Sequence, residues 1–169
     1  MRKATLILIP VTLALAAGGA TGYASAGKPV SAPASVAAKQ ATIKTRHGSL
    51  GTFLVDGSGR TLYLFRKDTG RQSKCYGPCA AVWPPVTTSG KPQAAGSARQ
   101  SMLSTSRRRN GTRQVLYNGH PLYRYAPDTR AGQTGGQGIN GFGARWYVVA
   151  PSGKAITSSS APPPSPYPY

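Results

Sequence analysis

Two stretches decide the fold: GTFLVDGSGRTLYLFRKDT at residues 51–69 and RQVLYNGHPLYRYAPDT at residues 113–129. Each stretch has an apolar run, a turn at Asp56 or Asn118 followed by Gly, a second run and a closing Asp-Thr. Asp-Gly and Asn-Gly between apolar runs are strong signals of a β-hairpin. The sequence therefore predicts two copies of one hairpin-based unit.

Aromatic residues alternate along the second run of each copy, and a Trp follows each closing Asp. A period of two places each aromatic pair on one face of a strand. Neither copy has enough apolar surface to be stable alone, so we expect the copies to bury these aromatics against each other. The predicted fold is all-β, a small sandwich or partly closed sheet; an exposed aromatic platform for a ligand is the alternative. The aromatics are Tyr63, Phe65, Trp83, Tyr123, Tyr125 and Trp146.

Both copies contain the pattern Tyr-x-aromatic-x-x-Asp, at residues 63–68 and 123–128, so Asp68 and Asp128 end equivalent segments. The first copy then passes through the two-cysteine segment CYGPC before its Trp. These features resemble the bacterial family of secreted repeats and predicted lipoproteins with the Yx(FWY)xxD motif, over most of residues 48–153. The resemblance implies an exported bacterial envelope or secreted protein whose biochemical role is not established.

The N-terminus has the layout of a secretory signal peptide. A positively charged start at residues 1–3 precedes an apolar run over 4–20, and Ala-Ser-Ala at 24–26 fits a cleavage site. We predict cleavage near Ala26, which places the mature protein outside the cell or in its envelope. Retention of the segment as a membrane anchor is the alternative. No Cys lies near the cleavage site, in contrast to the lipoprotein members, so no lipid anchor is expected.

Composition divides the rest of the chain into one folded domain and two loose ends. Both ends lack a clear apolar period, so we predict a linker before the domain and a disordered Pro-rich tail after it. Within the single β domain, a basic connector with few large apolar residues joins the two repeats. The predicted segments are a signal peptide at 1–26, a linker at 27–45, a domain at 46–157 with repeats 47–86 and 114–156 and connector 87–113, and a tail at 158–169.

Charge is the strongest global feature of the sequence. The 169 residues include 21 Lys and Arg but only three acidic residues, which gives a formal net charge of +18. An exported chain of this charge attracts polyanions, and salt weakens such binding. We predict anionic cell-envelope polymers or lipid head groups as partners, without specific nucleic acid; a merely solvated basic surface is the alternative. The arginines predicted to bind polyanions are Arg99, Arg107, Arg108, Arg109 and Arg113.

Cys75 and Cys79 are the only cysteines of the chain. An even pair at close spacing in an exported protein most simply forms a disulfide. The alternative is a redox or copper-handling dithiol, which an imidazole would help to complete. His120 is one candidate for such a metal site, although its place in a hairpin favours an exposed turn residue, and His47 has no partner that the sequence identifies.

Carboxylate chemistry is restricted because the chain has no Glu and only three Asp. We predict that Asp68 and Asp128 close turns at strand ends; a pair of facing carboxylates that shares a proton or binds a cation is the alternative. Asp56 is predicted to be a turn residue. The run G-x-G-x-x-G at 136–141 lacks the flanking strand and helix of a dinucleotide site and is predicted to be a loop. No catalytic constellation can be assembled, so we predict a non-enzyme without a cofactor.

Two functions follow from these patterns. The first is a non-enzymatic binding or structural module attracted to anionic cell-wall material. The alternative is a redox or copper-handling exported protein that uses Cys75 and Cys79. The first function predicts salt-sensitive association with the cell that survives Cys→Ser changes, whereas the second predicts reducible thiols and bound metal.

Overall fold

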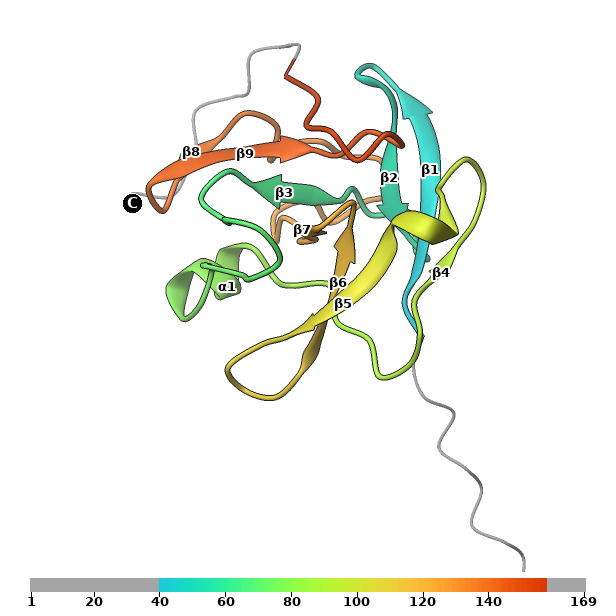
Figure 1. Ribbon diagram of the computed structural model, residues 1–169. Coiled ribbons are helices and arrows are strands. Elements are labelled where there is room, and N and C mark those ends of the chain that lie inside the picture. The colour runs from blue at the N-terminus through green and yellow to red at the C-terminus, as the bar shows by residue number, and fades with distance from the viewer. Residues whose placement is uncertain (1–39, 158–169) are drawn as a thin grey trace, which may run out of the picture. The chain divides into compact units, whose positions relative to one another are not determined.

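The computed structural model of the chain describes residues 40–157. The predicted signal peptide, most of the predicted linker and the predicted tail therefore fall outside the described residues. The described part contains nine strands, one short α-helix and one 3-10 turn (Figure 1). No helix in this part is long and apolar enough to span a membrane. The prediction of an all-β fold is confirmed.

The strands of residues 40–157 form three sheets of three strands each. Strand β1 lies between β2 and β4, strand β9 between β3 and β8, and strand β6 between β5 and β7. The bounds are β1 Thr42–Gly48, β2 Gly51–Asp56, β3 Tyr63–Phe65, α1 Pro78–Val82, β4 Gln93–Ala94, η1 Gln100–Met102, β5 Leu103–Arg107, β6 Arg113–Tyr117, β7 His120–Pro121, β8 Asn140–Gly141 and β9 Ala144–Val148.

Each repeat opens with an antiparallel hairpin, β1 with β2 in the first copy and β5 with β6 in the second. The inner strand of the first hairpin is buried on both faces because successive side chains of a strand point in opposite directions. Phe53 and Val55 enter one hydrophobic cluster, whereas Leu54 enters a second cluster. The second cluster also holds Val115 of β6, so the two repeats contribute to a common core.

The two predicted turns differ in length. Asn118 and Gly119 form the two-residue turn between β6 and β7, with φ of 48° and 80°, which the Asn-Gly pair predicts. The Asp56 turn is longer, because the backbone N–H of Asp56 donates to the carbonyl of Arg60 and Gly59 takes the positive φ of 85°. Asp-Gly therefore marks this turn correctly but does not form a two-residue hairpin.

The two repeats exchange their last strand segments. The backbone N–H of Leu54 donates to the carbonyl of Val149, Val149 donates to Leu62, and Leu62 donates to Leu54, at 2.8–3.1 Å. An equivalent ring of three hydrogen bonds joins Val115, Val86 and Leu122 at 2.8–3.0 Å. The segment after the first Trp thus completes the hairpin of the second repeat, and the segment after the second Trp completes the hairpin of the first.

Two predicted boundaries need correction. Strand β5 lies within the predicted connector 87–113, so the second repeat begins well before residue 114. The missed signal is Asn110-Gly111, which closes the β5–β6 hairpin with a φ of 81° at the glycine. The first strand, β1, begins at Thr42, inside the predicted linker, because Ile43 is fully buried in the core.

Candidate functional site

The motif tyrosines and aspartates form hydrogen bonds across the two repeats. The Tyr63 hydroxyl donates to Asp128 Oδ2 at 2.5 Å, and the Tyr123 hydroxyl donates to Asp68 Oδ2 at 2.7 Å. The backbones of the two tyrosines also pair, with N···O distances of 2.9 and 3.0 Å. Each aspartate accepts a further backbone hydrogen bond within its own copy. The motif therefore ties one repeat to the other.

Burial shifts the pKa values of the motif tyrosines and aspartates. Burial raises the pKa of Asp68 and of Asp128 above 3.8, and their hydrogen bonds offset only part of this increase. Burial and the adjacent carboxylates also raise the pKa of Tyr63 and Tyr123, so both tyrosines remain protonated donors. Each carboxylate thus accepts a hydrogen bond from one tyrosine hydroxyl and one from a backbone N–H.

The remaining motif aromatics form a continuous stack in the core. Phe65 lies 3.9 Å from Trp146, Trp146 lies 4.0 Å from Trp83, and Trp83 lies 4.4 Å from Tyr125, measured between ring centroids. Residues of the two repeats alternate along this stack. All four side chains are at most 3% exposed, so the aromatics bury one another rather than presenting a platform to a ligand.

The glycine-rich loop closes over this stack. A Cβ on Gly136 would lie 2.8 Å from Trp83 and 2.9 Å from the Tyr63 ring. The backbone N–H of Gly136 also donates to the Tyr63 hydroxyl at 3.2 Å. Close packing against the aromatics therefore explains the glycine in this run.

Cys75 and Cys79 form a disulfide, as the sequence predicts. The two residues are 0% and 5% exposed. Arg108 holds the first cysteine to the β5–β6 hairpin, because its Nη2 donates to the Cys75 carbonyl at 2.7 Å. Its Nη1 donates to Ser73 Oγ at 2.9 Å and to Gln114 Oε1 at 2.6 Å.

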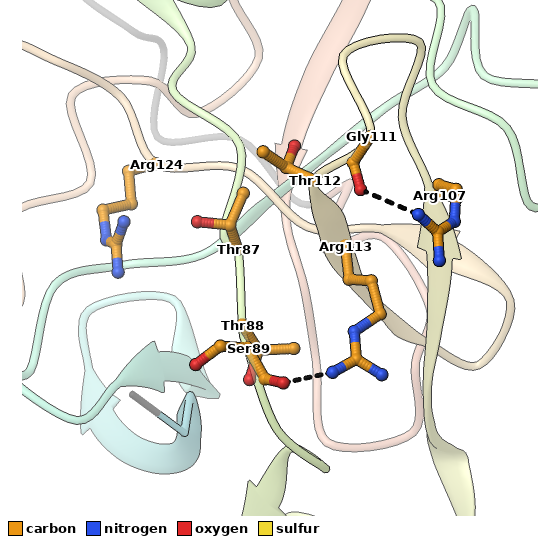
Figure 2. Close-up of a pocket in the computed structure, with 8 residues that line it drawn as sticks. All are labelled: Thr87, Thr88, Ser89, Arg107, Gly111, Thr112, Arg113 and Arg124. Atoms are coloured by element: carbon orange, nitrogen blue, oxygen red, sulfur yellow. Dashed lines mark hydrogen bonds between the residues drawn. The ribbon is translucent and has the colours of Figure 1, made fainter. Parts of the chain in front are cut away.

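A surface hollow of about 770 Å³ lies beside the same hairpin (Figure 2). Arginines and hydroxyl residues dominate its lining, and none of the lining residues is acidic. Figure 2 shows Arg107 and Arg113 on one side of Thr87 and Arg124 on the other. The lining residues, which we call the arginine groove, are Thr87, Thr88, Ser89, Arg107, Gly111, Thr112, Arg113 and Arg124.

Arg107 and Arg113 are directly opposed across β5 and β6. The neighbouring pair is hydrogen-bonded, since the Arg108 N–H donates to the Thr112 carbonyl at 2.8 Å. Arg107 and Arg113 therefore occupy a non-hydrogen-bonded position, where side chains of an antiparallel pair lie closest. Like charges directly opposite each other are destabilising. Within residues 40–157, the Arg107 side chain donates to the carbonyl of Gly111 and that of Arg113 to the carbonyl of Ser89, and neither forms an ion pair with a carboxylate.

Arg124 differs because it forms the only ion pair within residues 40–157. Its Nε lies 2.6 Å from Asp56 Oδ2. The hydrogen bonds from Ser58, Arg124 and Arg60 hold the pKa of Asp56 below 3.8, although burial of the carboxylate opposes this decrease. Arg124 and Thr87 also line a second hollow of about 290 Å³, so the two hollows adjoin at these residues.

The structure divides the five arginines predicted to bind polyanions. Arg107 and Arg113 meet in the arginine groove. Arg108 is only 6% exposed and bonded internally, so its prediction as a surface contact is wrong. Arg109 is exposed and lies over the Tyr76 ring at 4.6 Å, and Arg99 is exposed outside the groove.

The histidines do not join the cysteines. His120 pairs with Tyr117 at the β6–β7 turn, and burial, with a smaller contribution from Arg66, lowers its pKa below 6.5. His47 Nδ1 lies 3.3 Å from Thr52 Oγ1. Among residues 40–157, no group of three or more His, Cys, Asp or Glu side chains is placed to hold a metal ion.

A family model named Lipoprotein_15, described as a secreted repeat of unknown function, matches residues 44–87 and 104–150. The chain belongs to this family. Each of the two matched segments covers most of one hairpin, β1–β2 or β5–β6, and the segment exchanged with the other repeat. As a member of a family of secreted repeats, the chain is an exported protein. Searches of curated proteins and of solved structures find no match.

The sequence patterns missed six of the eight residues of the arginine groove, among them Arg124 and Thr87. Arg124 lies between the two aromatics of the second motif, where the first motif has the buried Leu64. A charged residue at this position indicates that the second copy is accessible to solvent where the first copy is buried. Thr87 carries no comparable local signal, because its position depends on strand exchange between repeats.

Proposed function

We propose that this secreted repeat protein is a non-enzymatic binding module that holds anionic cell-envelope polymers in the arginine groove. In this proposal the signal peptide is removed and no lipid anchor is attached, so the groove itself retains the protein at the envelope. The partner chemistry is an anion with several acceptor oxygens, because guanidinium groups supply forked N–H donors to such groups.

The opposed pair Arg107 and Arg113 is the observation that carries this proposal. Two exposed guanidinium groups at a close cross-strand position repel each other, and no described carboxylate compensates them. A bound anion relieves this repulsion and converts an unfavourable pair into a binding site. The Thr87 side chain adds a hydroxyl with no hydrogen-bond partner in the described chain.

The buried disulfide weighs against the redox or copper alternative. A thiolate is the form that binds metal or attacks another disulfide. Cys75 and Cys79 are joined to each other and almost inaccessible, so they offer no exposed thiol in this state.

The test is co-sedimentation of the purified mature protein with isolated cell envelopes of its host at increasing salt concentration. We expect the Arg107→Gln/Arg113→Gln variant to bind about tenfold more weakly at low salt, because charge-assisted hydrogen bonds are lost. The matched control is Arg71→Gln/Arg130→Gln, which removes the same charge from exposed residues outside the groove. Equal loss in both variants would contradict binding in the groove.

The same assay separates the two functions. The Cys75→Ser/Cys79→Ser variant should still sediment with envelopes if the groove is the binding site. Copper measured in the wild-type protein by elemental analysis, and absent from the Cys→Ser variant, would instead support the metal-handling alternative.

A further inference from the structure

The arginine groove contains two separate cationic centres, and this arrangement bears on the size of its ligand. Arg107 and Arg113 form one centre at the end of the β5–β6 hairpin. Arg124 forms the other and lies on the far side of Thr87 (Figure 2). A ligand that contacts both centres must extend past Thr87.

A second hollow adjoins the groove at Arg124. The second hollow shares Thr87 and Arg124 with the groove, and its lining also includes Thr42, Ser58 and the carboxylate of Asp56, which is paired with Arg124. Volumes of about 770 and about 290 Å³ are in the range of sites for ligands of many atoms. An extended chain can contact both adjoining hollows, which together we call the trough, whereas an isolated ion can occupy only one of them.

The hairpin pair also discriminates between types of anion. A guanidinium fork matches the two coplanar oxygens of a carboxylate, so one Arg occupies the shared edge of those oxygens and leaves only their outer lone pairs for a second donor. The two charged oxygens of a phosphodiester lie on a tetrahedral centre, so their lone pairs are not confined to one plane. Two adjacent forks, from Arg107 and Arg113, can therefore both bond to one phosphate.

Arg124 is suited to a second, weaker contact. Its Nε is used by Asp56, which leaves the two terminal nitrogens of the guanidinium for a ligand. Asp56 also neutralises part of the charge, and its carboxylate is held ionised by its lowered pKa. The strong centre thus lies at the hairpin, and the weak centre lies toward the second hollow.

We propose that the trough binds a linear phosphodiester polymer of polyol phosphate, with one phosphate between Arg107 and Arg113 and a later phosphate of the same chain at Arg124. This inference rests on the proposed function and names the ligand of the same groove. It predicts that affinity depends on chain length and on phosphate chemistry, not on total charge alone.

The test is calorimetric titration of the full mature protein with glycerol phosphate, with longer poly(glycerol phosphate) chains and with poly-glutamate of equal charge. We expect the longer chains to bind at least about tenfold more tightly than the single unit and than poly-glutamate. The Arg107→Gln/Arg113→Gln variant should lose most of this affinity. The Arg124→Gln variant should lose the gain from chain length while it keeps the binding of the single unit.

Four results would overturn the inference. Equal affinity for poly-glutamate would show that the groove does not prefer phosphate. Equal affinity per molecule for the single unit would show that the ligand is not bound as an extended chain. If the Arg124→Gln variant kept the full gain in affinity from chain length, Arg124 would not form the second contact with the ligand. Tighter binding of an oligodeoxynucleotide of equal charge would assign the groove to nucleic acid.

Different results would contradict the proposed function itself. Binding of anionic chains that is equally reduced in Arg71→Gln/Arg130→Gln would leave a general attraction to anions but no groove site. Absence of any binding at low salt, with intact fold by circular dichroism, would contradict both the proposed function and this inference.

Discussion

At the residue scale, the cross-repeat Tyr–Asp pairs are the most specific contacts of the fold. Each pair places a buried carboxylate against a phenol of the other repeat, at 2.5 or 2.7 Å. Burial of a carboxylate is costly unless donors compensate it. The motif is a pattern within one repeat of the sequence. Its Tyr and Asp nevertheless form contacts between the two repeats of the structure.

We predict that Tyr63→Phe and Tyr123→Phe each lower the free energy of unfolding by about 1–3 kcal/mol, because each removes a donor from a buried carboxylate. Urea denaturation measures this change. Tyr147→Phe is the control, because its hydroxyl makes no hydrogen bond in the described chain, and its effect should stay within about 0.5 kcal/mol. Equal effects at all three positions would contradict a special role of the pairs.

The raised pKa of Asp68 predicts a pH dependence with a defined sign. The folded state holds a proton on Asp68 at a pH where the unfolded chain, with a pKa near 3.8, has lost it. This group therefore stabilises the fold more as the pH falls from neutral toward about 4. The stability of the wild type relative to Asp68→Asn should increase over that range, as denaturation at several pH values measures. A decrease would show that the pKa is lowered instead.

At the element scale, the disulfide segment and Arg108 support the β5–β6 hairpin. The guanidinium of Arg108 bonds to Cys75, Ser73 and Gln114 and also lies 4.5 Å from the Tyr76 ring centroid. Arg107 and Arg113 flank the same turn. The buried arginine thus fixes the hairpin that carries the exposed pair.

We predict that Arg108→Gln destabilises the protein by about 2–3 kcal/mol, because buried acceptors lose a charged donor. Arg108→Lys should not restore stability, since an ammonium group cannot reproduce the planar fork. Arg109→Gln, at the neighbouring exposed position, should change the melting temperature little. Full rescue by lysine in thermal denaturation would show that charge alone matters.

The disulfide itself should contribute about 2 kcal/mol, because the closed loop is short. Denaturation of the Cys75→Ser/Cys79→Ser variant measures this contribution. A variant that fails to fold at all would show that the segment is a folding requirement and not only a local brace.

At the scale of the whole molecule, strand exchange makes the two repeats one cooperative unit. The rings of hydrogen bonds, the Tyr–Asp pairs and the aromatic stack all join residues of different repeats. We predict that fragments 40–96 and 97–157 are each unfolded alone and recover native circular dichroism when mixed. A fragment that folds by itself would contradict this interlocked arrangement.

The sequence predicts this architecture only as far as local signals reach. Alternating aromatics and turn residues such as Asn118 identify the hairpins, and the pairing of Cys75 with Cys79 follows from their spacing. Strand exchange leaves no local signal, because Val86 and Val149 look like ordinary strand residues whichever hairpin they join. The sequence predicts the arginine groove only in part. Charge identifies Arg107 and Arg113, but the same criterion also selects Arg108, which is buried.

The most direct test of the binding account is a map of the ligand contacts by NMR. The protein labelled with nitrogen-15 is titrated with poly(glycerol phosphate), and the backbone amide and arginine Nε signals are followed. We predict that the largest shifts fall on Thr87, Arg107, Arg113 and Arg124. Shifts spread evenly over exposed arginines such as Arg71 and Arg130 would contradict a defined groove and leave only diffuse attraction between the basic protein and the polymer.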